Sequence, residues 1–345
     1  MKLGLSLGYS GARVDFPIGL VQLAERLGYD SVWTAEAYGS DAMTPLAWIA
    51  AQTTRIRLGT GIAQLAGRTP AMCAMQAMTI DGLAGGGRMI VGLGVSGPQI
   101  VEGWYGQPWG TPYWRVRDYV QIMQKIFRRD EPAAHEGREI SLPYTGEGAT
   151  GLGKPLRSIL HQPHRIPVFL GSGSDAMLRL CGELCDGVLP LRFVPREMPR
   201  FRKAIEAGFA RAGNGKSWDS FSFEPGVPVI VTDDVPAALR TLKPSVALYV
   251  GGMGHPSVNF HKRAMEQQGY GDAAARIEEL FRAGRKQEAA EAVPDEFVDD
   301  AALVGSPDRI RARYQPWADC GVTGLHIGTR DPAAVELMAQ IAGLT

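Results

Sequence analysis

This sequence has no net charge, because its 36 lysines and arginines are matched by 36 aspartates and glutamates. Without an overall field the protein is not expected to gather nucleic acid or an anionic membrane, and a small molecule is the expected partner. The chain also lacks any apolar run near the roughly 18 residues that identify a membrane-spanning helix. Neither nucleic-acid binding nor membrane insertion is therefore expected.

Cysteine is scarce as well, with only Cys73, Cys181, Cys185 and Cys320 in 345 residues. The first residues lack the charged start, apolar run and small-residue cleavage site of a secretory signal. Four cysteines in such a chain predict reduced thiols rather than a disulfide framework, so we expect a cytoplasmic protein. Hydrophobic residues make up 45% of the chain, which is ample for a large core.

Short apolar runs alternate with helical segments, as in parallel strands joined by helices. Counting these runs gives eight expected strands, at residues 3–7, 31–34, 57–61, 89–94, 168–170, 188–190, 228–231 and 324–327. Eight strands favour a closed barrel over an open sheet, and barrels of this kind run from about 200 to over 400 residues. We predict an α/β fold, a (β/α)8 TIM barrel made by a single domain of residues 1–345.

Two stretches do not fit the simple repeat. Residues 137–165 are rich in glycine at their start and show no helical period, which predicts an excursion loop. Residues 234–300 are helical but too long for one crossover, and glycines at 251–252 and 269 interrupt them. They predict a helical insertion after strand seven.

Glycines follow or end five of the expected strands, namely Gly8, Gly61, Gly94, Gly171 and Gly328. Barrel enzymes place their chemistry at this end of the strands, and glycine lets the backbone approach a flat ligand closely. Turns from strand to helix favour glycine in any case, so only the joint occurrence carries weight. It indicates a broad planar cofactor at the mouth.

The segment Leu170-Gly171-Ser172-Gly173-Ser174-Asp175 runs from a strand directly into a helix. Free N–H groups and the positive end of the helix dipole suit a phosphate at such a place. Ser174 or Asp175 could equally cap the helix, so both interpretations stay open.

Residues 92–97, Gly-Leu-Gly-Val-Ser-Gly, match the dinucleotide fingerprint G-x-G-x-x-G, and Asp118 lies near the spacing of a ribose-binding acid. The following Pro98 and an aromatic cluster provide no immediate helix to receive a pyrophosphate. We therefore do not expect a Rossmann site.

Several segments, in this order, resemble the luciferase-like monooxygenase superfamily, in the branch of oxidoreductases that use the deazaflavin coenzyme F420. They are LAERLGYDSVW at residues 23–33, RLGTGI at 57–62, GGGRMIVGLG at 85–94, LVGSP at 303–307 and GVT at 321–323. The likeness covers nearly the whole chain, and it implies a bacterial luciferase-like barrel.

This resemblance also implies where a cofactor would lie. It places a non-proline cis peptide at Gly61-Ile62, behind the middle ring of the cofactor. It places the phosphate at residues 171–173, in agreement with the local reading. The implied cofactor-binding residues are Glu36, Ala37, Thr60, Gly61, Ile62, Gly94, Val95, Ser96, Gly171, Ser172 and Gly173.

The chain departs from the family pattern after strand two. Several deazaflavin enzymes carry an Asp-His pair there, whereas this chain has Glu36-Ala37. Glu36 is then a candidate to exchange a proton with the substrate, although a structural role is favoured. Glu102, on the loop after strand four, is the second candidate catalytic acid.

Other polar groups are weaker candidates. His161 and His164 are separated by a proline that breaks a helical ligand face, and no metal site is expected. Cys181 and Cys185 are one helical turn apart, which is typical of a packed face. His255 and His261 flank the helical insertion, where they could line a substrate cavity.

The function expected first is an F420-dependent oxidoreductase that transfers a hydride between the deazaflavin and a small organic substrate, in a direction that stays open. One alternative is an FMN-dependent monooxygenase of the same superfamily, since both cofactors share a ring shape and a phosphate. Another is a non-catalytic protein that binds a flavin or deazaflavin. A homo-oligomer is compatible with each.

Overall fold

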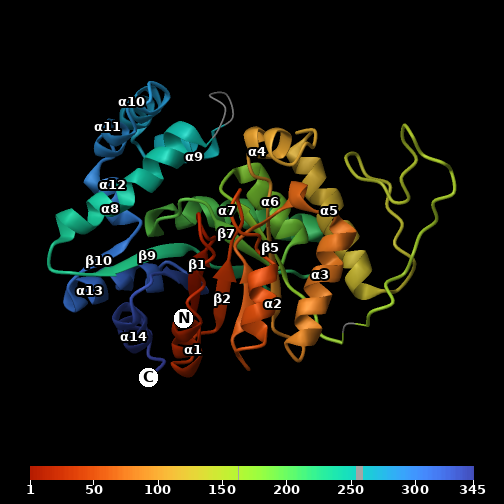
Figure 1. Ribbon diagram of the computed structural model, residues 1–345, viewed down its shortest axis with the longest axis horizontal. Helices are drawn as coiled ribbons and strands as arrows, with labels where there is room; N and C mark the ends of the chain where they lie inside the picture. Colours follow the sequence, from red (N-terminus) through yellow and green to blue (C-terminus); the bar gives the residue numbers. More distant parts are fainter. Residues whose placement is uncertain (162, 254–258) are drawn as a thin grey trace.

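The computed structural model describes residues 1–161, 163–253 and 259–345. Seven parallel strands lie side by side in the order β11-β1-β2-β3-β5-β6-β7. Figure 1 labels β1, β2, β5 and β7 among them. Their bounds are β1 (Lys2–Gly8), β2 (Ser31–Thr34), β3 (Arg57–Thr60), β5 (Met89–Gly94), β6 (Val168–Ser172), β7 (Gly187–Pro190) and β11 (Gly324–Gly328).

The gap between β7 and β11 in the barrel wall is filled by one stretch of chain, which pairs with both of these strands. Its first part, β8 (Ser222–Phe223), pairs with β7, and the start of β9 (Gly226–Val231) pairs with β11. In that second pairing Gly226 lies opposite His326 and Pro228 lies opposite Gly328. This stretch is the eighth position of a closed ring, so the predicted barrel is confirmed, although the wall begins before the expected residue 228.

Helices cover the outside of the barrel and bury their apolar faces against it. They are α1 (Ile18–Arg26), α2 (Thr44–Ala50), α3 (Pro70–Leu83), α5 (Pro112–Arg128), α6 (Asp175–Leu184), α7 (Met198–Ala212), α13 (Pro307–Asp319) and α14 (Pro332–Ile341). Ser306 caps α13 and Pro307 opens it. None of the helices in the described ranges is long and apolar enough to span a bilayer.

Large side chains fill the inside of the barrel. Trp33, Ile90 and Phe169 are buried there together, and the indole of Trp33 stacks on His326 with ring centroids 4.2 Å apart. A Cβ on Gly59 would lie 2.3 Å from the Trp33 ring, so that strand must carry glycine to admit the indole. The layer around Trp33 closes the barrel below its mouth.

The helical insertion after strand seven is also confirmed. It contains α8 (Val235–Ala247), α9 (Phe260–Gln267), α10 (Gly271–Arg282), α11 (Lys286–Glu291) and α12 (Asp295–Asp300), which share their own apolar core. The expected interruptions are confirmed. The helix α8 continues into the π-helical turn η4 (Leu248–Gly252), which ends at the predicted glycine pair, and Gly269 lies between α9 and α10. The far end of β9 pairs with β10 (Leu303–Gly305), so the insertion begins and ends beside the same short ladder.

A long segment between α5 and β6, residues 129–167, stands out from the body and is called the arm below (Figure 1). Within it, isolated bridges join Ala133 to Leu156 and His135 to Leu142. The carboxylate of Asp118 on α5 holds its base, accepting hydrogen bonds from the N–H groups of Glu139 and Ile140 at 2.7 and 3.0 Å. Asp118 thus anchors the arm. The assignment of the whole chain to a single domain stays a prediction.

Candidate active site

The mouth of the barrel contains a cis peptide bond between Gly61 and Ile62, as the resemblance implied. It lies in the bulge between β3 and the two-residue strand β4 (Ala63–Gln64), which pairs with the end of β5. A Cβ on Gly61 would be 3.5 Å from the indole of Trp33, so the bulge lies directly above the packed interior. The carbonyl of Ile62 accepts a hydrogen bond from the N–H of Glu36.

The glycines at the ends of β5 and β6 enclose the side chain of Ile62. A Cβ on Gly94 would lie 2.6 Å from Ile62 Cδ1, and a Cβ on Gly171 would lie 2.9 Å from Ile62 Cγ2. Real Cβ atoms do not approach this closely, so both positions require glycine while Ile62 occupies this place. The structure therefore brings together three of the predicted residues from three neighbouring strands.

Glu36, the first candidate catalytic acid, is buried in a complete set of donors. One carboxylate oxygen accepts from the N–H of Gln64 at 2.5 Å and from Arg68 at 2.7 Å. The other accepts from the N–H of Ala42 at 3.0 Å and again from Arg68 at 2.7 Å. A carboxylate held in this way acts as an acceptor on both oxygens, which favours the structural role for Glu36.

Arg68 is the partner that the sequence did not reveal. Its side chain is only 10% exposed, and burial by itself would lower the pKa of the guanidinium. The hydrogen bonds and negative charge of Glu36 outweigh that effect and hold the pKa of Arg68 above its usual value. The pair fastens the loop after β2 to the segment after β4, on either side of the cis peptide.

Two further predicted contacts are buried beside this bulge. The Thr60 hydroxyl donates to the carbonyl of Gly92 at 2.8 Å and accepts from its N–H at 2.9 Å, which ties β3 to β5. Ala37 follows Glu36 and is 9% exposed. Whether these residues touch a cofactor stays a prediction.

The chain after β5 differs from the expectation of a loop without a helix. Val95 and Ser96 follow the strand, Ser96 in the left-handed conformation at φ 60°, and the helix α4 (Pro98–Gly103) begins almost at once. A proline in the first turn of a helix is well tolerated, because its missing N–H has no intrahelical partner there. Glu102 therefore lies on α4, where it is exposed, rather than on a loop.

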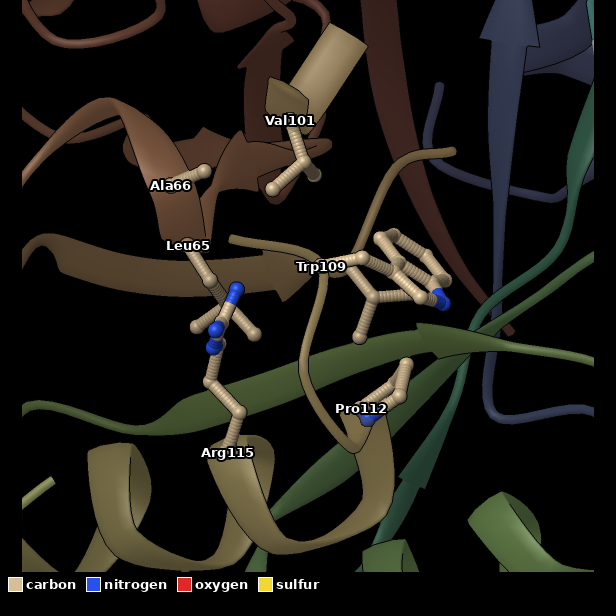
Figure 2. A pocket seen from close by; sticks show the side chains of 7 residues that line it. Leu65, Ala66, Val101, Trp109, Pro112 and Arg115 are labelled. Atoms are coloured by element: carbon tan, nitrogen blue, oxygen red, sulfur yellow. The ribbon is translucent and has the colours of Figure 1, made fainter. Parts of the chain in front are cut away.

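Figure 2 shows the small hollow behind this turn. It has a volume of about 10 Å³, which is room for a single water molecule. Its walls come from η1 (Leu65–Gly67), α4, α5 and the loop between these two helices. The large side chains are Trp109, from that loop, and Arg115, from α5. Val95, which follows β5, also lines this hollow.

The start of α6 retains free N–H groups. Ser174 takes the capping position, but its side chain makes no capping hydrogen bond. Arg200 instead donates to the carbonyl of Gly173 at 3.2 Å and to the carboxylate of Asp175 at 2.6 Å. The first-turn amides beside Gly171, Ser172 and Gly173 are consequently left for another acceptor, which favours the phosphate interpretation over simple capping.

The structure adds a cluster of which the sequence indicated only His261. The guanidinium carbon of Arg192, two residues after β7, lies 5.8 Å from the ring centroid of Tyr249. The rings of Tyr249 and His261, both in the insertion, have centroids 4.6 Å apart. Arg192 and Tyr249 are distant in sequence, so spacing did not predict their contact.

The weaker candidates are distributed elsewhere. His161 lies on the arm beside Arg129, His164 packs against Gly86, and Cys181 and Cys185 are buried in the packing of α6. His255 lies outside the described residues. Within residues 1–161, 163–253 and 259–345, no three His, Cys, Asp or Glu side chains are grouped as metal ligands.

Comparisons with known proteins agree on one family. A Mycobacterium tuberculosis protein provisionally named a coenzyme F420-dependent oxidoreductase is 48% identical over 99% of both chains. The 5,10-methylenetetrahydromethanopterin reductase of Archaeoglobus fulgidus is 28% identical over 93% of this chain and 92% of its own.

The fold has solved counterparts. The coenzyme F420-dependent tetrahydromethanopterin reductase of Methanopyrus kandleri superposes with a TM-score of 0.79 at 24% identity, covering 100% of this chain and 99% of the other. The sequence model of the luciferase-like monooxygenase family matches residues 2–324. The chain therefore belongs to the luciferase-like monooxygenase family.

Proposed function

We propose that this protein is an F420-dependent oxidoreductase that transfers a hydride between the deazaflavin and a small organic substrate. The observation that carries the proposal is the 48% identity over 99% of the chain to a relative with that provisional name. The deazaflavin, when bound, supplies the carbon that accepts or releases the hydride, so the protein's part is binding and orientation.

The residues at the mouth fit such a group. The backbone around Gly61, Ile62, Gly94 and Gly171 presents few side chains, as a planar ring requires. The phosphate would lie at the start of α6, where the first-turn N–H groups and the preceding residues Gly171, Ser172 and Gly173 would hold it. Ala37, Thr60, Val95 and Ser96 belong to the same proposed site, as neighbours of these strand ends.

The side chains of this site have three proposed roles: positioning of the backbone, exclusion of water and proton exchange. Glu36 and Arg68 fix the segments on both sides of Ile62, so Glu36 acts as a positioning residue. Trp33 and Leu189 close the interior beneath Gly61 and exclude water from that side. Glu102, exposed on α4, stays the candidate for proton exchange with the substrate.

Three cofactor titrations of the purified protein test the proposal, each followed by cofactor fluorescence and calorimetry. Coenzyme F420 should bind saturably, a deazaflavin without the phosphate should bind at least tenfold more weakly, and FMN should also bind weakly. Preferential FMN binding would instead support the monooxygenase. Tight F420 binding with no redox exchange across a panel of acceptors would support a non-catalytic binding protein.

A homo-oligomer is part of the same proposal. The outer face of α3 exposes Met72, Met75 and Leu83, and the arm exposes Leu152, Leu156 and Ile159. Between α3, α5 and the arm lies a cavity of about 720 Å³ lined mainly by apolar atoms.

Because one chain carries both apolar surfaces, a second copy related by a two-fold axis can cover each with the other. Light scattering should then give the mass of a dimer or larger assembly, and Met75→Glu should shift it toward the monomer. A monomeric wild type would contradict the assembly.

A cytoplasmic location is also part of the proposal. It is supported by the four free thiols.

A further inference from the structure

Arg192 lies where barrel and insertion meet. It comes directly after Leu191, whose side chain borders Gly173, and it adopts the left-handed conformation at φ 52°. Gln268 of the insertion donates to the main-chain carbonyl of Arg192 at 2.7 Å. The backbone of Arg192 is therefore held at the rim of the mouth, between β7 and the insertion, and the residue is half-buried there.

No carboxylate within the described ranges forms an ion pair with Arg192. Other buried arginines have partners of different kinds: Arg68 pairs with Glu36, whereas Arg88 donates to the carbonyls of Thr53 and Ile56. Burial lowers the pKa of Arg192 to about 10, opposed only by the nearby Tyr249. A cation withdrawn from water without an anion is costly, unless the anion arrives with a ligand.

The two rings beside Arg192 provide further polar atoms and no negative charge at neutral pH. Burial and the charge of Arg192 lower the pKa of His261 to about 3, so its imidazole is neutral. Among the residues that the structure describes, none forms a hydrogen bond with the buried Nδ1 of that ring. Burial, with a smaller effect of Tyr9, raises the pKa of Tyr249 to about 12, so its phenol keeps its proton.

We propose that Arg192, Tyr249 and His261 form a binding site for an anionic group of the substrate, a carboxylate or a phosphate. A guanidinium offers two parallel N–H donors that match either group, and a phenol beside it can donate a third hydrogen bond. The unpartnered Nδ1 of His261 can accept from a hydroxyl of the same ligand, or donate in its other tautomer.

The position of the cluster favours the substrate over the cofactor as the source of this anion. Ile62 and its glycines occupy the ends of β3, β5 and β6. Arg192 follows β7, and Tyr249 interacts with Tyr9, which follows β1. The cluster therefore lies at the ends of strands that carry neither Ile62 nor its glycines, although β7 is the neighbour of β6. This inference rests on the proposed function, because it assumes that the substrate docks at the mouth.

Calorimetric titrations test the site without knowledge of the natural substrate. The probes are propionate, inorganic phosphate and the neutral analogue propionamide, each added to the protein with and without saturating F420. Wild type should bind at least one of the two anions and not propionamide. Arg192→Met should weaken anion binding at least tenfold, Arg192→Lys should restore part of it, and the affinity for F420 should change less than twofold.

Arg196→Gln is the matched control, because Arg196 lies four residues away and forms an exposed ion pair with Asp300. Its anion affinity should equal that of wild type, and thermal unfolding confirms that each variant folds. Equal anion affinity in wild type and Arg192→Met would overturn the site. A tenfold loss of F420 affinity in Arg192→Met would assign the cation to the cofactor and overturn the substrate assignment.

The two proposals fail separately. Wild type that does not bind F420 but loses its anion binding on Arg192→Met would refute the F420-dependent function and leave an anion site at the mouth. Wild type that binds F420 and neither anion would refute the anion site alone.

Discussion

Nε2 of His326 lies 2.8 Å from a carboxylate oxygen of Glu224 inside the barrel, and both side chains are almost fully buried. Burial alone would raise the pKa of Glu224. The hydrogen bond and charge of His326, helped by Arg57 and Lys2, outweigh burial and hold that pKa below its usual value. The pair lies in the wall that closes the ring, since His326 belongs to β11 and Glu224 joins β8 to β9.

Glu224→Gln should change how stability depends on pH. Because the folded-state pKa is depressed, the carboxylate contributes its full stability above about pH 4.5, and the contribution is lost as pH falls through the folded-state pKa. We expect the free energy of unfolding of the variant to be roughly 1–3 kcal/mol lower at pH 7. It should also fall less steeply than that of wild type as the pH is lowered. Urea unfolding from pH 7 to pH 3 measures both, with the exposed Glu296→Gln as control. Parallel curves for wild type and Glu224→Gln would contradict this reading.

Glu36→Gln should destabilise the fold strongly, because it leaves the buried guanidinium of Arg68 without a counter-charge. Removing one partner of a buried pair costs about 3–5 kcal/mol. Urea unfolding should report a loss of that size. Glu102→Gln, which alters an exposed glutamate, should unfold like wild type, and a loss below about 1 kcal/mol for Glu36→Gln would refute the positioning role.

Gly94→Ala should distort the mouth, because the new Cβ would collide with Ile62. Overpacking of this kind costs typically about 1–3 kcal/mol, and F420 affinity should fall as Ile62 shifts. Gly103→Ala is the control, since nothing lies within 4 Å of a Cβ there. If Gly94→Ala costs as much stability in an Ile62→Ala background as in wild type, the collision is not the cause.

Thiol labelling should distinguish Cys320 from the other cysteines. Cys73, Cys181 and Cys185 are buried, and burial raises the pKa of Cys73 to about 11 and that of Cys181 well above its usual value. Only Cys320 is partly exposed. About one thiol per chain should react with a chromogenic disulfide in the native state, and all four after denaturation. Rapid labelling of three or more native thiols would contradict the structure.

Much of the barrel follows from local pattern. Buried parallel strands are short apolar runs, and their ends carry glycine wherever another residue approaches closely, as at Gly94 and Gly171. The helix α4 does not follow from the pattern, because Pro98 indicates a break as readily as the first turn of a helix. The strand β10 was missed because three residues are too short to show alternation.

The sequence predicts the candidate site less completely than it predicts the barrel. The resemblance located the cis peptide, because it lies in a continuous segment, and the phosphate loop stays a prediction. The partners of Glu36 come from elsewhere, with Arg68 lying 32 residues away. Arg192, Tyr249 and His261 meet only because the insertion folds back over β7. Contacts of this kind depend on tertiary packing, which periodicity and spacing do not encode.

The division of β9 between two partners has a consequence for exchanging parts among relatives. Pro228 pairs with the barrel and Val229 pairs with β10, although they are consecutive. A chimaera joined inside β9 would therefore cut both the barrel wall and the ladder that supports the insertion. Junctions after Val231 and before Leu303 keep both pairings intact. Residues 232–302 are thus the natural cassette through which one barrel could be given another substrate preference.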